Sequence, residues 1–140
     1  LAELRAPAVA IAEEITAVLS EILIRGEAPD QVPATWVPMH GDLAPWNLRR
    51  VRGRRVLLDW ESAAFGPPDA DVTYYRAAVS TISRREPEPA PDEAVMYWIE
   101  RVKARPVTDS DAGFNARLLH ALTAMHSNRN FGAEVTTSHD

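Results

Sequence analysis

Three oxygen-bearing side chains near the middle of the sequence have the types and the spacing that phosphoryl transfer requires. Asp42 and Asn47 lie five residues apart in a loop that contains Pro45, and Asp59 follows a predicted β-hairpin. Mg²⁺ prefers hard oxygen ligands such as carboxylates and amide oxygens, with water and phosphate completing its shell. In phosphoryl transfer the metal neutralises the phosphates while an aspartate accepts the proton of the attacking hydroxyl. The set therefore offers one carboxylate as a base, and an amide and a second carboxylate as magnesium ligands.

A longer pattern surrounds these residues. The sequence reads His40-Gly41-Asp42, then Asn47, then Asp59, and later Gly66-Pro67-Pro68-Asp69-Ala70-Asp71. With this pattern the stretch 37–75 resembles the aminoglycoside phosphotransferase/choline kinase family, a small-molecule branch of the protein-kinase-like fold. That family writes its catalytic loop H-G-D-x-x-x-x-N, where protein kinases write H-R-D-x-x-x-x-N. The ordered set around a hairpin is far more specific than a lone His-Gly-Asp.

The resemblance implies a role for each residue of the central set. Asp42 would be the catalytic base, and Asn47 and Asp59 would hold the Mg²⁺ that bridges the phosphates of ATP. The implied reaction is transfer of a phosphoryl group from ATP to a hydroxyl of a small molecule, whose identity the sequence does not give. In the family the acceptor binds between the catalytic loop and the C-terminal helices, which points here to residues 92–125.

Five further residues are expected to support the site. The resemblance makes His40 a structural residue that hydrogen-bonds the backbone, and makes Asp71 the residue that opens the next helix and braces the loop. Asp71 also suits the N-cap of that helix. Gly41 is explained by backbone conformation, because glycine takes positive φ freely. Trp60 and Glu61 stand where protein kinases have Phe-Gly. We expect Trp60 to pack beneath the loop, and Glu61 to be either solvated or an outer ligand of the metal.

The composition restricts the class of protein. A chain of 140 residues with 46% hydrophobic content fits one globular domain. It has no cysteine, which excludes disulfides and zinc–thiolate sites, and no apolar run of about 18 residues that could span a membrane. The net charge of −5 argues against nucleic acid as a partner, and the five arginines of residues 49–55 are better explained as the polar face of a hairpin. We expect a cytoplasmic protein, because ATP is available there.

The position of the single lysine, Lys103, bears on the organisation of the protein. Kinase-like folds hold the ATP phosphates with a lysine on an N-terminal strand, beneath a glycine-rich loop. Both should precede His40, and neither does. We therefore expect residues 1–140 to be a C-terminal lobe that lacks the nucleotide-gripping lobe, with that lobe or a second subunit as a partner. The alternative is a non-catalytic binding or scaffold module, and a remoter one is a metal-dependent hydrolase using His40 and Asp42.

The elements that must position the site are mostly helical. Apolar residues at three- and four-residue spacing predict a helix over 3–25. Arg52-Gly53 predicts the turn of a hairpin whose second strand buries residues 56–58 and delivers Asp59 at its end. Helices are expected behind Asp71, from Asp92, and from residue 109 or 110. A proline-rich link covers 86–91, and 128–140 is expected to be a disordered tail. The predicted fold is mostly α, an α+β kinase-like C-lobe: a helical bundle with one small β-hairpin.

Overall fold

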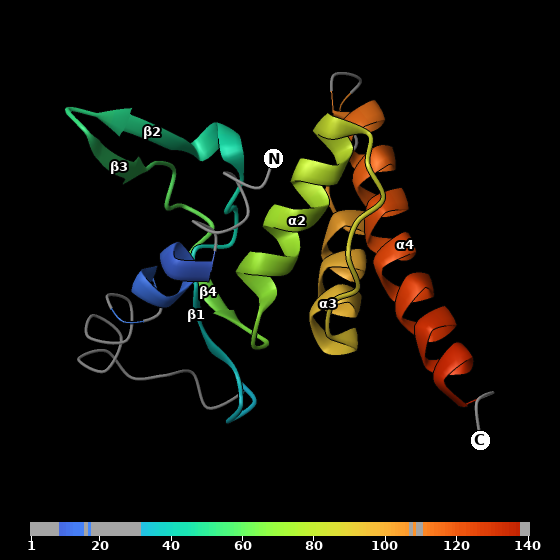
Figure 1. The fold of residues 1–140 in the computed structure, drawn as a ribbon. Helices are drawn as coiled ribbons and strands as arrows, with labels where there is room; N and C mark the ends of the chain where they lie inside the picture. The colour runs from blue at the N-terminus through green and yellow to red at the C-terminus, as the bar shows by residue number, and fades with distance from the viewer. Residues whose placement is uncertain (1–8, 16, 18–31, 107, 109–110, 138–140) are drawn as a thin grey trace. The chain divides into compact units, whose positions relative to one another are not determined.

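The chain folds into helices and short strands, shown as a ribbon in Figure 1. The computed structural model describes residues 9–15, 17, 32–106, 108 and 111–137, with side chains as far as residue 126. It divides into two compact units, Leu1–Tyr75 and Arg76–Asp140. Helices predominate over strands among the described residues, which confirms the predicted fold class. Within those ranges no helix combines the length and the apolar character that a membrane span requires.

A β-hairpin in the first unit carries the arginine-rich segment. Strand β2 (Leu48–Val51) pairs antiparallel with β3 (Arg54–Leu57), and Val51 lies opposite Arg54. The two turn residues, Arg52 and Gly53, have φ of 50° and 77°. Two successive residues with positive φ form the turn whose twist matches that of a hairpin. The predicted two-residue turn is therefore confirmed.

A second small sheet, in addition to the one hairpin expected, lies in the same unit. Strand β1 (Val37–Met39) pairs antiparallel with β4 (Ala64–Gly66). A Cβ atom at Gly66 would lie 2.5 Å from the Met39 sulfur, so the two strands approach closely at this glycine. Because β1 leads into residues 40–47, the predicted catalytic loop, and β4 leads into the Gly-Pro-Pro segment, this pairing holds the two loops next to each other.

The second strand of the hairpin is more exposed than the sequence suggested. Val56 and Leu58 are 37% and 41% exposed, and Leu57 is half-buried. The prediction that residues 56–58 form a buried strand is therefore wrong. The physical reason is that β2 and β3 form a two-stranded ribbon, with which no other strand of the described residues pairs. Such a ribbon leaves much of its surface to solvent.

Two helical segments complete the first unit. Residues 9–15 are helical, with Ile11 and Ile15 buried, whereas much of the helix predicted over 3–25 lies outside the described residues. Helix α2 (Ala70–Ser83) begins one residue before Asp71, and its first turn is closed by the N–H of Thr73 donating to the carbonyl of Asp69. Asp71 is therefore not the N-cap of α2, and its side chain is used elsewhere. The boundary between the two units falls inside α2.

The second unit is built on two helices that pack against each other. Helical spacing predicts that α3 (Asp92–Lys103) buries a stripe of Val95, Trp98, Ile99 and Val102. The structure buries Val95, Trp98 and Val102 and leaves Ile99 half-buried. Helix α4 (Ala112–Thr137) buries Leu118, Leu122 and Met125. The link between α2 and α3 has no regular structure, although Pro87 and Ala90 within it are buried. Helix α4 includes residues 128–137 of the segment for which disorder was expected.

Candidate functional site

The catalytic loop is tied to helix α2 by one carboxylate. The backbone N–H of His40 donates to Asp71 Oδ2 at 2.8 Å, and the N–H of Gly41 donates to Asp71 Oδ1 at 3.0 Å. Asp71 is only 5% exposed. Burial raises the pKa of this carboxyl above its ordinary 3.8, and outweighs the two backbone N–H groups and His40, which act in the opposite direction. The side chain thus fixes the start of the loop from inside the protein.

His40 is fully buried, and both of its ring nitrogens are engaged. Nδ1 accepts a hydrogen bond from the N–H of Asp42 at 3.1 Å, so it carries no proton. Nε2 lies 3.0 Å from the carbonyl oxygen of Leu58 and must donate to it, because a carbonyl can only accept. Both ring nitrogens of His40 are therefore engaged within the protein, and neither is left for a metal. This geometry removes the basis for a hydrolase that uses His40 and Asp42 as metal ligands.

Gly41 occupies a position that no other residue type fits without strain. Its φ is +88°, which confirms the expectation of a positive φ at this residue. A Cβ atom there would lie 2.2 Å from the backbone carbonyl oxygen of Ser62. The obstruction is main chain rather than a flexible side chain, so it cannot be relieved by a change of rotamer. Gly41 therefore allows the loop to pass directly against the segment that follows Asp59.

Asp42 and Asn47 are brought together by the loop. Asn47 Nδ2 donates to the Asp42 backbone carbonyl at 2.8 Å and to Asp42 Oδ2 at 2.9 Å. The turn between them is a short 3₁₀-helix, η1 (Pro45–Asn47), in which the N–H of Asn47 donates to the carbonyl of Ala44. Neither Asp42 Oδ1 nor Asn47 Oδ1 accepts a hydrogen bond from the described residues. One carboxylate oxygen and one amide oxygen of this pair are therefore available.

Asp59 stands beside this pair because the hairpin ladder continues past its strands. The N–H of Leu58 donates to the carbonyl of Asn47 at 2.8 Å, so Asp59 is the next residue after a direct contact with Asn47. Its φ is 59°, a conformation that aspartate tolerates better than most residues other than glycine. Asp59 and Glu61 are exposed, and neither carboxylate is engaged by a described residue.

These donors fit a magnesium ion. Among the described residues there is no group of three or more His, Cys, Asp and Glu side chains that could hold a metal. An amide oxygen from Asn47 and a carboxylate from Asp59 are instead the small, hard donor set with which Mg²⁺ is held when water and phosphate supply its other ligands. The assignment of Asn47 and Asp59 as metal ligands, and of Glu61 as an outer ligand, stays a prediction.

Trp60 takes a different position from the one expected beneath the loop. It is 40% exposed, and its ring meets that of His40 edge-on, with 4.7 Å between ring centroids. Its indole N–H donates to the carbonyl of Leu57 at 3.0 Å. Trp60 therefore covers one side of His40 while its other surface faces solvent. The indole is held at the hairpin by its hydrogen bond, which keeps it from moving further under the loop.

Several backbone groups that hold the site could not be identified from the sequence. The carbonyl of Leu58 accepts from His40, and its N–H donates to Asn47. The carbonyl of Ser62 lies against Gly41. Main-chain groups are present at every residue, so no side-chain pattern marks the ones that matter here. Only the paired strands and loops of the folded chain identify them.

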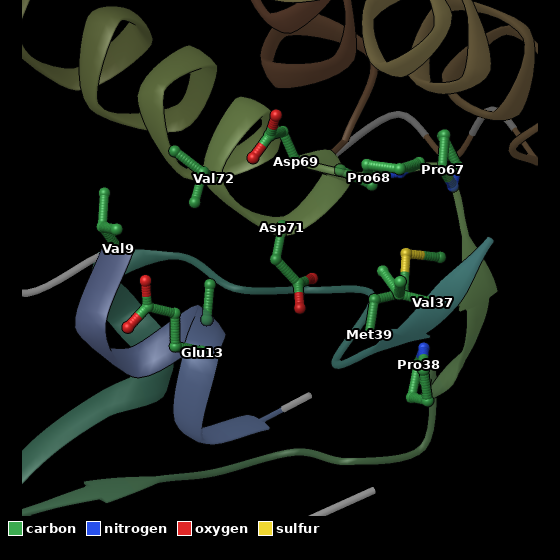
Figure 2. A pocket seen from close by; sticks show the side chains of 12 residues that line it. Val9, Glu13, Val37, Pro38, Met39, Pro67, Pro68, Asp69, Asp71 and Val72 are labelled. Atoms are coloured by element: carbon green, nitrogen blue, oxygen red, sulfur yellow. The ribbon is translucent and has the colours of Figure 1, made fainter. Parts of the chain in front are cut away.

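Two hollows lie near the site in the first unit. The first, of about 330 Å³, is lined in part by Asp71. Figure 2 shows the Asp71 side chain pointing from α2 toward the strand that carries Val37 and Met39. Its lining does not include Asp42, Asn47 or Asp59. The second hollow, of about 500 Å³, lies against the hairpin. It is lined by apolar side chains, two arginines, one glutamate and a glycine: Ile11, Ile15, Leu48, Leu57, Trp60, Arg54, Arg55, Glu14 and Gly53.

Comparison with known proteins gives one match. A family model described as the phosphotransferase enzyme family matches residues 2–106, which is 105 of the 140 residues. The matched range contains the catalytic loop, the hairpin, α2 and α3, whereas α4 lies beyond it. No curated protein and no solved structure gives a match. The α+β organisation of the described residues is consistent with a kinase-like fold.

Proposed function

Because the chain belongs to the phosphotransferase enzyme family, we propose that it acts in the transfer of a phosphoryl group from ATP to a hydroxyl of a small molecule. The observation that carries this proposal is the pairing of Asp42 with Asn47 through Nδ2, with Asp59 adjacent through the hairpin ladder. Asp59 lies 17 positions after Asp42 in the sequence, and it directly follows the residue whose N–H donates to the Asn47 carbonyl. Phosphoryl transfer needs a base and metal ligands in this relation.

Asp42 is the proposed base. Its Oδ2 is occupied by Asn47, which leaves Oδ1 to accept the proton of the acceptor hydroxyl. As the hydroxyl O–H bond breaks toward Oδ1, the hydroxyl oxygen forms a bond to the γ-phosphorus, and ADP departs with the electrons of the bond that it held. Two hydrogen bonds fix the orientation of the Asp42 carboxylate: one from Asn47 Nδ2 to Asp42 Oδ2, and one from the backbone N–H of Asp42 to His40 Nδ1. Positioning of this kind supplies much of the rate in phosphoryl transfer.

Asn47 and Asp59 are the residues that would hold Mg²⁺. The ion, when bound, would neutralise charge on the transferring phosphates. The chain's own contribution is to hold these two donors in place: Asn47 by its contacts with Asp42, and Asp59 through the Leu58 peptide. Metal ligation benefits from donors that are held before the ion arrives.

The hollow against the hairpin supports a nucleotide as the donor. Trp60 and the apolar side chains of its wall suit the flat face of a purine, and Arg54 and Arg55 in its lining suit phosphate oxygens and outnumber the one acidic residue there, Glu14. The hollow lies on the same hairpin that delivers Asp59. This is the basis for assigning ATP, rather than a simpler phosphate donor, to the reaction.

Further parts of the proposal follow from the resemblance of the catalytic loop. We place the chain in the aminoglycoside phosphotransferase/choline kinase branch, as the lobe that carries the catalytic loop. A lysine-bearing lobe or a second subunit would grip the ATP phosphates, since no lysine precedes His40. A cytoplasmic location would supply the ATP. A scaffold module without turnover is not favoured, because the residues that we propose as base and metal ligands, Asp42, Asn47 and Asp59, are all present.

The test is calorimetric titration of ATP into the chain, with Mg²⁺ and with EDTA. We expect binding that requires Mg²⁺ and that weakens at least tenfold in Asp59→Asn. Asparagine tolerates positive φ as aspartate does, so the variant removes the charge without straining the backbone. Asp69→Asn is the matched control, because Asp69 is also an exposed aspartate with positive φ, at 66°, outside the catalytic set.

Each outcome of this titration bears on the proposal. Mg²⁺-dependent binding lost in Asp59→Asn and kept in Asp69→Asn supports a metal–nucleotide site at the hairpin. Equal binding by both variants would contradict the assignment of Asp59 as a metal ligand. The absence of any ATP binding, with or without Mg²⁺, would contradict the proposal that this chain takes part in nucleotide binding.

A further inference from the structure

A pocket of about 560 Å³ in the second unit is bordered by basic side chains. Arg84 and Arg85 come from the turn that follows α2, and Arg117 and His120 come from α4. Glu86 is the acidic residue of the lining. We call this the cationic pocket. Its apolar wall is formed by Pro87, Ala116, Ala121 and Ala124.

The charges of the cationic pocket are not compensated within the described residues. None of the three guanidinium groups forms an ion pair or hydrogen bond with another described residue. Three arginines against one glutamate leave the lining with a formal charge of +2 when His120 is neutral. The whole chain has a net charge of −5. A concentration of unpaired arginine in an acidic chain is a feature that attracts anions.

The backbone that carries the first two arginines is held in place. Ser80 Oγ donates to the carbonyl oxygen of Arg85, and Pro87 is buried. Arg84 has a φ of 55°, directly after the last residue of α2. Helices commonly end on a residue in this conformation, and it is usually glycine because other side chains are strained there. The protein is therefore less stable with arginine at position 84 than it would be with glycine, but the arginine places a guanidinium group at the pocket.

We propose that the cationic pocket binds a small molecule that bears a carboxylate or phosphate group. A guanidinium group presents its N–H donors in a planar fork that matches the oxygens of either group. The alanines and Pro87 offer an apolar surface to the rest of such a ligand, and the pocket's volume lies within the usual range for small-molecule sites. All of the lining belongs to the second unit, so the inference holds whether or not the chain transfers phosphate at Asp42.

The experiment uses three probes that share a phenyl ring: the anions phenyl phosphate and benzoate, and the neutral benzyl alcohol. Each is titrated into the full 140-residue chain by calorimetry, and by NMR observation of the arginine Nε–Hε signals. We expect the anions to bind at least tenfold more tightly than benzyl alcohol and to shift the signals of Arg84 and Arg117. Comparison of the two anions tells whether the site favours phosphate or carboxylate, and either preference supports the proposal.

Two variants and one control make the result specific. Arg117→Gln should weaken binding of the anions about tenfold. Arg84→Gly should weaken it similarly while raising the midpoint of thermal unfolding by about 4 °C, because glycine relieves the positive φ. Lys103→Gln removes one positive charge on α3, outside the pocket, and should leave binding unchanged.

The result that would overturn the proposal is equally definite. Anions that bind no better than benzyl alcohol would exclude an oxyanion site. Anion binding that all three variants weaken equally would show a general effect of net charge rather than a pocket. Binding that neither Arg117→Gln nor Arg84→Gly changes would place the anion elsewhere on the chain.

Discussion

Replacing Gly41 with alanine should lower the free energy of unfolding by more than the cost of placing alanine at a positive φ. At φ of +88° an alanine costs about 1–2 kcal/mol relative to its favoured conformations. The new Cβ also meets the Ser62 carbonyl oxygen at 2.2 Å, so the loop must move. The loop is held by two hydrogen bonds to the buried Asp71 carboxylate, and losing one bond to a charged group costs about 1.5–3 kcal/mol. We expect a total of about 3–5 kcal/mol.

Gly53→Ala is the matched control for this prediction. Gly53 also has a positive φ, 77°, but a Cβ there would meet nothing within 4 Å. It should therefore show only the conformational term, about 1–2 kcal/mol. The measurement is the free energy of unfolding of both variants from urea denaturation, followed by circular dichroism. Equal losses in the two variants would refute the reasoning, because the contact with Ser62 and the ties to Asp71 would then contribute nothing measurable.

Two further predictions concern the carboxylates of Asp42, in the loop, and Asp71, in α2. Asp42→Asn should reduce phosphoryl transfer by a factor of about 10²–10⁴, the usual contribution of a general base, with the free energy of unfolding unchanged within about 0.5 kcal/mol; retained turnover in an assay of the enzyme would contradict the assignment of Asp42. The Asp71 carboxyl should titrate above 3.8 in a carbon-detected NMR titration, because burial raises its pKa. The part of the unfolding free energy that arises from this raised pKa is then full below 3.8 and is lost as the pH rises through the raised pKa, while the hydrogen bonds from the N–H groups of His40 and Gly41 remain. The difference between the native chain and Asp71→Asn should accordingly shrink over that pH range, and a difference that grows with pH would refute the sign.

The sequence predicted the parts of the site that depend on local chemistry. Gly41 was expected to take positive φ, and it does. Arg52-Gly53 was expected to form a two-residue hairpin turn, and the strand register confirms it. The buried stripe of α3 followed from helical spacing. These features are determined by a few neighbouring residues, so the order of residue types was enough to find them.

The features that the sequence missed depend on contacts between distant segments. Strand β4 has three residues, Ala64–Gly66, which is too short for an alternating pattern, and it exists because β1 pairs with it. Asp71 has the chemistry of an N-cap, but two backbone N–H groups of the catalytic loop compete for its oxygens and hold them. Leu58 appeared to belong to a buried strand, and no third strand covers the hairpin there. In each case the local sequence is compatible with more than one structure, and contacts with distant segments determine which one forms.

The contacts that locate Asp59 have a consequence for how this site can vary among related sequences. The peptide of Leu58 is held on both sides, by Asn47 at its N–H and by His40 at its carbonyl, while the Leu58 side chain is largely exposed. The contacts at this position are thus made by main-chain atoms, which every residue other than proline retains. Drift at position 58 should leave the site intact for almost any side chain. Proline is the exception, because it has no N–H with which to reach Asn47.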